Sequence, residues 1–397
     1  MIAYGEVAAV EGAAVRVRVP GAAIGSRLRI AAPRGFIGAT VTSLRERLAF
    51  AAADEPLDGV QAGAVVYSDF VTPHQPLGTA WIGRTIEAYG GIALPAAPDP
   101  FAREPLDRAF WTGVRAIDAL LTIACGARVG IFGPPGAGKS TLLHAIVRHS
   151  HADAVVLALI GERGREAEEW ARAAPAHATI VCATGDRIAS SRIAAAHAAM
   201  AQANALRSRG LHVLLVVDSL ARYANALREV AIANGELAGR AGYPPGVFAA
   251  LARYTETAGS ANGGSITALA SVLSDGDERD PVSDAARSLL DGHIQLCPKL
   301  AARGHFPAID VLQSTSRTMT SAAGLGHRND ARCVRAALAR LAATADARSL
   351  GIGVAGQDGE RAAQAESAID AFLQQGDGPA QVPETLSALA GLADTLR

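Results

Sequence analysis

The chain has 397 residues, of which 50% are hydrophobic and 5% aromatic, and its formal net charge is −1. This length predicts two or three domains with a core of small aliphatic side chains. The balanced charge gives no sign of the basic face that nucleic-acid-binding proteins carry. Four widely separated cysteines without a C-x-x-C pair argue against a zinc site or a disulfide framework. No signal-peptide pattern or long apolar run is present, so we expect a cytosolic protein.

Residues 1–72 are predicted to form a small β-barrel. Val15, Val17 and Val19 alternate with arginines, which is the period of two that is typical of a half-buried strand. Glycines and prolines interrupt the short strand-like runs at roughly regular spacing between Gly12 and Gly59. We therefore expect a separate N-terminal barrel domain that ends near residue 72.

Residues 73–322 are predicted to form an α/β domain. A Pro- and Gly-rich connection, Pro73 to Pro105, comes first and contains one strand-like piece around Trp81. Beyond it, apolar runs alternate with helical segments, which favours a largely parallel sheet covered by helices. The predicted strands are Val129–Phe132, Val155–Ile160, Thr179–Ala183, Val213–Val217 and a run near Ile266–Leu273.

Residues 323–397 are predicted to form a C-terminal α-helical domain, because the strand signal ends there. Ala331–Ala345 and Glu360–Gln374 have the composition of Ala-rich helices, and a Gly-rich turn at Gly351–Gly359 separates them. The expected fold class is therefore α/β, with a small β-barrel before the central domain and helices after it.

One motif in the central domain points to a nucleoside triphosphate. The segment from Gly133 to Ser140 fits G-x-x-x-x-G-K-[ST] and lies between a predicted strand and a predicted helix. Its glycines allow a tight turn that directs several N–H groups at one anion, and the helix N-terminus adds a favourable dipole. We expect Lys139 to reach the β- and γ-phosphates and Ser140 to bind Mg²⁺. The candidate nucleotide-binding residues are Gly133, Pro134, Pro135, Gly136, Ala137, Gly138, Lys139, Ser140 and Thr141.

Two further segments carry carboxylates that suit phosphoryl transfer. Asp218 ends the apolar run Leu214–Val217, as does the acidic residue that holds Mg²⁺ in phosphate-loop ATPases; the alternative is a helix N-cap. Glu162 leaves the strand Val155–Ile160 at its carboxyl end and can polarise the attacking water. Next to it, Arg163 can stabilise charge on the γ-phosphate and Glu166 can support the Mg²⁺ water shell. The alternative for all three residues, Glu162, Arg163 and Glu166, is a solvated charged loop.

Taken together, these segments resemble the catalytic-type subunits of the rotary ATPase superfamily, which have a RecA-like P-loop core. Four other segments are similar to that superfamily as well: Thr112–Asp118, Gly242–Pro245, Gly264–Thr267 and Leu290–Ile294. Within it, Tyr223–Glu229 and Gly304–Leu312 look like the ATPases of type III secretion systems and of flagellar export. The residues Asp310–Leu312, which come before Ser314–Arg317, are more similar to ATPases of virulence-type secretion systems than to those of flagellar export.

The resemblance implies a Mg²⁺-dependent ATPase that forms a homohexamer at the cytoplasmic face of the inner membrane and powers protein export. ATP and Mg²⁺ are then the cofactors, and Arg317 falls at the position of an arginine finger that enters the neighbouring subunit's site. Phe306 falls where the family places an aromatic side chain on the adenine. The implied partners are further copies of the chain, stalk and regulator proteins, and secreted effectors with their chaperones, but no nucleic acid.

Several alternatives stay open at this point. The chain resembles a flagellar export ATPase almost as well, and a catalytic-type subunit of another rotary ATPase is also possible. A hexameric RNA translocase shares the core fold but needs a basic, aromatic-lined surface on the barrel, for which the sequence gives no sign. A non-catalytic ring subunit is disfavoured, since such subunits typically replace the carboxylate at the position of Glu162.

Overall fold

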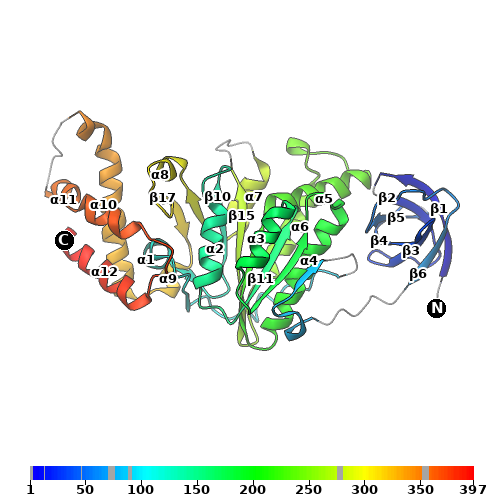
Figure 1. Cartoon of the computed structure of the whole chain (residues 1–397), viewed down its shortest axis with the longest axis horizontal. Coiled ribbons are helices and arrows are strands. Elements are labelled where there is room, and N and C mark those ends of the chain that lie inside the picture. Colours follow the sequence, from blue (N-terminus) through cyan, green and yellow to red (C-terminus); the bar gives the residue numbers. More distant parts are fainter. Residues whose placement is uncertain are drawn as a thin grey trace.

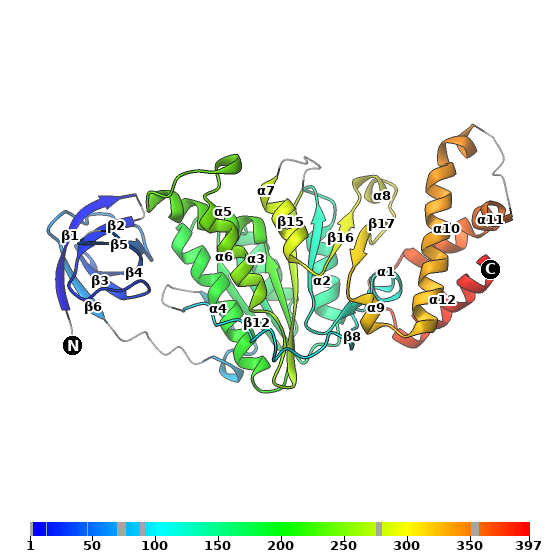
Figure 2. The same ribbon diagram turned by 180° about the vertical axis from the view of Figure 1, so that it is seen from behind.

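The computed structural model describes residues 3–12, 14–45, 47–69, 77–87, 92–274, 280–350 and 357–397. The molecule is elongated, with a β-barrel at one end, a bundle of helices at the other and an α/β core between them (Figure 1). The same three-part arrangement is seen from behind (Figure 2). The predicted fold class is thereby confirmed.

Six antiparallel strands close the N-terminal barrel, in the order β1-β2-β5-β4-β3-β6. Val15, Val17 and Val19 are all buried in its core, in agreement with the predicted alternation. Closure pairs both edges of the sheet, so the barrel presents no free strand edge. The strands are β1 (Ala3–Glu11), β2 (Ala14–Arg18), β3 (Arg27–Ala32), β4 (Gly35–Arg45), β5 (Leu48–Ala53) and β6 (Val65–Asp69).

The core is built on one large sheet with the order β17-β16-β10-β15-β13-β11-β12-β7. Its strands are parallel except β17, which runs antiparallel to β16, while β14 (Gly259–Ala261) pairs antiparallel with β15. All five predicted strands lie within strands of this sheet. The strands are β7 (Thr85–Glu87), β10 (Arg128–Gly133), β11 (Ala154–Ile160), β12 (Ala178–Ala183), β13 (His212–Asp218), β15 (Gly264–Leu273), β16 (Gly292–Leu296) and β17 (Ile309–Ser316).

Helices cover both faces of the sheet, which explains why its strands are apolar throughout rather than alternating. In β11, Val155 and Leu157 face opposite ways from Val156: the first two join the cluster that contains α2, and Val156 joins the cluster that contains α4. One face carries α2 (Lys139–His149) and α3 (Gly164–Ala173). The other carries α4 (Ala189–Arg207), α5 (Leu220–Ala233), α6 (Pro245–Glu256) and α7 (Pro281–Leu289).

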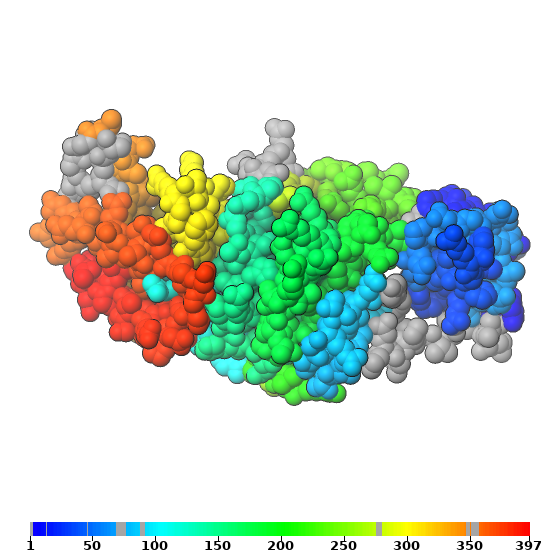
Figure 3. All heavy atoms as spheres, viewed as in Figure 1, coloured from blue at the N-terminus to red at the C-terminus, as the bar shows by residue number. Residues whose placement is uncertain are grey.

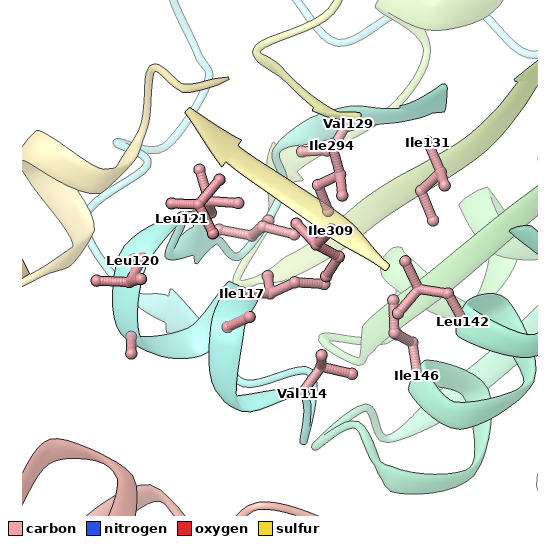
Figure 4. Packing of buried hydrophobic residues seen from close by; sticks show 14 of the residues in the cluster. Val114, Ile117, Leu120, Leu121, Val129, Ile131, Leu142, Ile146, Ile294 and Ile309 are labelled. Atoms are coloured by element: carbon pink, nitrogen blue, oxygen red, sulfur yellow. The ribbon is translucent and has the colours of Figure 1, made fainter. Parts of the chain in front are cut away.

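The C-terminal helices share the hydrophobic cluster of the α2 face. Around α1 (Arg115–Leu120), Ile117 packs among side chains of β10, β17 and α2, including Ile131, Ile309 and Ile146 (Figure 4). The same cluster continues into α10 (Leu325–Ser349), α11 (Gln357–Leu373) and α12 (Val382–Leu396). The remaining short elements are η1 (Thr79–Trp81), β8 (Ala109–Phe110), β9 (Ile123–Ala124), η2 (Arg240–Gly242), α8 (Pro298–Ala302) and α9 (Met319–Ala322).

Two local predictions were wrong. Trp81 lies in the short helix η1 rather than in a strand, because Gly83 takes a left-handed conformation (φ 75°) that turns the chain before β7. The predicted turn at Gly351–Gly359 falls partly outside the described residues, and its last three residues form the start of α11 instead. Gly359 is buried there, so packing outweighs its poor helix propensity.

Asp118 in α1 holds the loop that precedes this helix. Its Oδ1 accepts hydrogen bonds from the Thr112 amide (2.8 Å) and the Thr112 hydroxyl (2.7 Å). Its Oδ2 accepts a hydrogen bond from the Gly113 amide (2.9 Å). Burial raises the pKa of Asp118 to about 6, although these hydrogen bonds favour the charged form.

Replacing Asp118 is therefore expected to destabilise the core. Asp118→Ala leaves three buried donors without an acceptor, at a cost of about 1–3 kcal/mol for each. Asp118→Asn retains one acceptor oxygen and should cost less. Thermal unfolding followed by circular dichroism should thus give midpoints in the order wild type, Asp118→Asn, Asp118→Ala. Equal midpoints for the Ala variant and the wild type would contradict this role.

Candidate active site

The phosphate-binding motif forms the turn between β10 and α2. Gly136 and Gly138 have φ values of 78° and 92°, a region that strains any residue with a side chain. The Lys139 ammonium donates hydrogen bonds to the carbonyl oxygens of Gly133 (2.6 Å) and Pro134 (2.8 Å). The lysine is thus folded over the loop at the N-terminus of α2, where backbone amides and the helix dipole favour an anion.

Glu162 and Asp218 lie at the same edge of the sheet, after β11 and at the end of β13. Both are buried, with exposed fractions of 5% and 8%. The Ser271 hydroxyl donates a hydrogen bond to Asp218 Oδ1 (2.5 Å). The N-cap of α5 is Ser219, whose hydroxyl accepts from the Arg222 amide, so Asp218 does not have the alternative capping role.

The carboxylates in this cluster repel one another. Burial, a hydrogen bond with Glu166 and the charge of Asp218 raise the pKa of Glu162 to about 9. The pKa of Asp218 is also raised, first by burial and then by Glu166, against the opposing effects of Ser271, Arg222 and Lys139. A cation placed between these carboxylates would relieve the repulsion.

Arg222 is a member of the cluster that sequence reasoning missed. Its Nη2 lies 3.2 Å from Glu162 Oε2, and its guanidinium also donates to the Gly161 carbonyl. The available signal was an arginine four residues after the strand-ending Asp218, which places it in the first turn of α5. Ser271 was missed as well, and its signal was a hydroxyl near the end of an otherwise apolar run.

Arg163 and Glu166 differ in their surroundings. Arg163 is the residue before α3, and its side chain is 83% exposed and 3.9 Å from Glu166. Glu166 lies in the first turn of α3 and contributes to the electrostatics of both Glu162 and Asp218. The structure therefore brings Lys139, Glu162, Glu166 and Asp218 together, while Arg163 lies at the surface.

Phe306 lines a cavity of about 490 Å³ beside the phosphate-binding loop. The cavity is bounded by Ala137, Gly138 and Thr141 on one side and by Gln375 of the C-terminal region on another. The Phe306 carbonyl accepts a hydrogen bond from the Gln375 amide (2.9 Å), and half of the Phe306 surface is exposed. This volume lies in the range of cavities that bind small ligands.

Arg317 lies at the opposite edge of the sheet from the phosphate-binding loop. Ser316 pairs with Gly292, which pairs with Val129 at the start of β10, whereas the loop follows Gly133 at the other end of that strand. The six residues of β10 separate the two edges by about 17 Å. Arg317 is exposed there, so its side chain is not part of the cluster in its own chain.

The oxygen atoms of the side chains at this site suit a Mg²⁺ ion that is bound jointly by the protein and a nucleotide. In the described ranges, no group of three or more His, Cys, Asp or Glu side chains could hold a metal ion. Mg²⁺ is commonly bound by one or two protein oxygens together with substrate phosphates and water. The exposed Ser140 at the start of α2 and the crowded Asp218 and Glu166 fit such a shared site.

None of the described helices is long and apolar enough to cross a membrane.

The known proteins that this chain resembles belong to the family that its motifs indicated. Residues 113–316 match the ATP synthase alpha/beta family, nucleotide-binding domain. The flagellum-specific ATP synthase of Treponema pallidum is 40% identical, over 94% of this chain and 89% of that protein. The type 3 secretion system ATPase of Pseudomonas syringae pv. tomato is 38% identical, over 99% and 94%.

A solved structure extends the similarity to the whole fold. The assembled ATPase EscN of the enteropathogenic E. coli type III secretion system aligns with a TM-score of 0.89 and 35% identity, over 98% of this chain and 100% of EscN. EscN has also been solved in complex with its central stalk, EscO. The resemblance that the motifs indicated is confirmed: the chain belongs to the ATP synthase alpha/beta family, in which it is an ATPase of the type 3 secretion and flagellar branch.

Proposed function

We propose that this ATPase works as a homohexameric ring that hydrolyses ATP with Mg²⁺ and powers protein export through a type III secretion apparatus. The observation that supports the ring best is the position of Arg317, one strand length away from the phosphate-binding loop of its own chain. An arginine finger at that position can act only on a neighbouring subunit. Contacts of this head-to-tail kind generate rings where the rotation between subunits closes.

Within one site, the loop from Gly133 to Thr141 binds the phosphates, and Lys139 neutralises charge on the β- and γ-phosphates. Ser140 and Asp218 hold the Mg²⁺ ion, with Glu166 on its water shell. When bound, the ion neutralises the charge that builds up on the phosphate oxygens. Phe306 packs on the adenine in the cavity beside the loop.

Glu162 orients the attacking water. In its ionised form, which the charge of Arg222 favours and which a cation bound beside Asp218 would favour further, it accepts the proton of that water. Its ion pair with Arg222 (3.2 Å) fixes the carboxylate at the edge of the sheet, which makes Arg222 a positioning residue for Glu162. Arg317 of the neighbouring subunit stabilises charge on the transferring phosphoryl group, and the exposed Arg163 adds to the positive charge around it.

The proposed setting is the cytoplasmic face of the inner membrane, reached through partner proteins. EscN binds a central stalk, EscO, and we propose that this chain binds a corresponding stalk protein, regulators, and secreted effectors with their chaperones. We also propose domain boundaries near residue 72, shortly after β6, and near residue 322, at the end of α9. Nucleic acid is not among the proposed partners.

Flagellar export is the second candidate function, and the similarity to a flagellum-specific ATP synthase supports it. A deletion of the gene, assayed for motility and for secreted proteins, separates the two candidates. Loss of secretion with normal motility supports the first proposal, and loss of motility supports the second.

The ring itself is tested by ATP hydrolysis across a series of protein concentrations, with molecular mass measured in parallel. Activity per subunit is expected to rise with concentration and to reach a plateau as the hexamer forms, and chelation of Mg²⁺ should abolish it. Activity per subunit that stays constant down to concentrations at which only monomer is present would contradict the ring.

A further inference from the structure

A groove with an apolar floor and a basic rim lies beside Arg317. We call it the Arg groove; its volume is about 680 Å³, and it runs between the end of β17, α9 and the first turns of α10. Leu325 in this groove is 66% exposed. Figure 2 shows α9 and β17 beside the start of α10. The groove is lined chiefly by Leu312, Met319, Leu325, Arg328, Arg332 and Arg335.

Among the described residues, the arginines of the Arg groove donate their side-chain hydrogen bonds to neutral groups. Arg328 donates to the Thr320 carbonyl (2.7 Å), Arg332 to the Asn329 side chain (2.7 Å) and Arg335 to the Ser314 carbonyl (3.2 Å). In the part of the chain that the structure describes, no carboxylate forms an ion pair with any of the three, and the buried Nε of Arg328 has no hydrogen-bond partner. Burial lowers the pKa of Arg335, and the charge of Asp310 opposes this effect. Within the described residues, the arginines of the groove therefore have Asp310 as a nearby negative charge but no carboxylate in an ion pair.

The complementary charge lies in α11, α12 and the segment between them. From Gln357 to Leu396 the chain has seven carboxylates and one arginine, whereas α10 has five arginines and two aspartates. Asp377 and Glu384 are exposed in this acidic stretch, and neither forms an ion pair within the described ranges. Asp377 also lines the cavity beside the phosphate-binding loop. Figure 3 shows the orange and red C-terminal helices bordering on the teal region of the core.

The positions of these two surfaces suit a head-to-tail contact. The Arg groove includes Ser316 and Met319, which flank Arg317, and the acidic stretch flanks the nucleotide cavity. If Arg317 enters the site of the next subunit, the Arg groove must lie against whatever borders that site. Asp377 and Glu384 are carboxylates at or near that border, so opposite charges meet without a change in either surface.

We infer that a second copy of this chain occupies the Arg groove, with its Asp377 and Glu384 set against Arg328 and Arg332 of the first. The inference rests on the proposed ring and adds what aligns the finger with the neighbouring site. Docking of the acidic border in the groove places Arg317 at the neighbour's nucleotide cavity. Subunit association and completion of the active site are thereby one event.

Charge reversal tests this contact through the concentration at which the oligomer forms, measured by mass photometry. Arg332→Glu is expected to raise that concentration on the order of tenfold, because like charges then face each other. The pair Asp377→Arg and Glu384→Arg should raise it similarly. Arg328→Glu and Arg332→Glu combined in one chain with both acidic-side changes should restore association towards the wild-type concentration, because each of the two pairs then again joins opposite charges. Arg34→Glu, the same change of charge in an exposed turn of the barrel, is the matched control.

The outcomes separate this inference from the ring itself. Arg332→Glu should melt like the wild type and, at saturating protein, reach the wild-type activity per subunit. An unchanged association concentration for Arg332→Glu overturns the inference, and so does a weakened association that the acidic-side changes do not rescue. If the wild type does not associate at any concentration, the proposed ring fails first. Rescue by the combined changes supports the contact.

Discussion

Glu162→Gln is expected to lower the rate of ATP hydrolysis by about 10²–10⁴-fold, the usual contribution of a positioned general base. Gln keeps the shape of the side chain but cannot accept the proton of the attacking water. Folding should be unaffected or improved, because burial among carboxylates raises the pKa of Glu162 to about 9 and so disfavours its charge. Single-turnover hydrolysis and binding of a fluorescent nucleotide measure the two effects separately.

The matched control for this variant is Glu168→Gln. Glu168 lies on the same helix as Glu166, but its side chain is 74% exposed and outside the cluster. It should hydrolyse ATP at the wild-type rate. A Glu162→Gln variant that binds nucleotide and retains more than about a tenth of the wild-type rate would contradict the role of a general base.

Arg317→Ala is expected to lower hydrolysis by about 10³–10⁵-fold, the range found for arginine fingers. The reason differs from that for Glu162, since in the proposed ring the guanidinium acts in the site of another subunit. Nucleotide binding and oligomer mass should stay close to those of the wild type, because Arg317 is exposed and, among the described residues, its guanidinium makes one long hydrogen bond, to the Arg287 carbonyl (3.5 Å). Steady-state hydrolysis at saturating protein, with mass photometry, measures both.

Two further variants test whether the loss of activity is specific to the guanidinium at position 317. Arg303→Ala removes another exposed arginine and should leave the rate of ATP hydrolysis unchanged. Arg317→Lys keeps the charge but loses the planar fork of donors, so it should recover only a small part of the activity. An Arg317→Ala variant that hydrolyses ATP normally would show that the finger is another residue or that the site is complete within one chain.

Local patterns in the sequence were sufficient for the parts of the site that lie on single elements. The phosphate-binding loop, Glu162 and Asp218 each follow a strand whose apolar run is visible in the sequence. A parallel sheet brings the carboxyl ends of such strands to one edge, so their proximity could be predicted without coordinates. The same reasoning gave the barrel, because the alternation at Val15–Val19 has a direct structural meaning.

Residues that join the site through register or packing could not be predicted in this way. Ser271 meets Asp218 because β15 and β13 are neighbours in one particular register, in which Ala270 pairs with Val217. Arg222 reaches Glu162 across two elements that are 60 residues apart in the chain. The distance of Arg317 from its own loop depends on the antiparallel direction of β17, which no periodicity reveals. The start of α11 was misplaced because burial of Gly359 outweighed its turn preference.

The most direct test of the account mixes the two inactive variants. In a ring with the finger in trans, an interface is complete when Glu162 comes from an Arg317→Ala subunit and Arg317 comes from a Glu162→Gln subunit. Random assembly of equal amounts makes about a quarter of the interfaces complete. Recovery of hydrolysis towards that fraction of the wild-type rate, from two preparations that are each inactive, is the predicted result. A mixture as inactive as its components, although mass photometry finds mixed hexamers, would contradict a ring whose sites are shared between subunits.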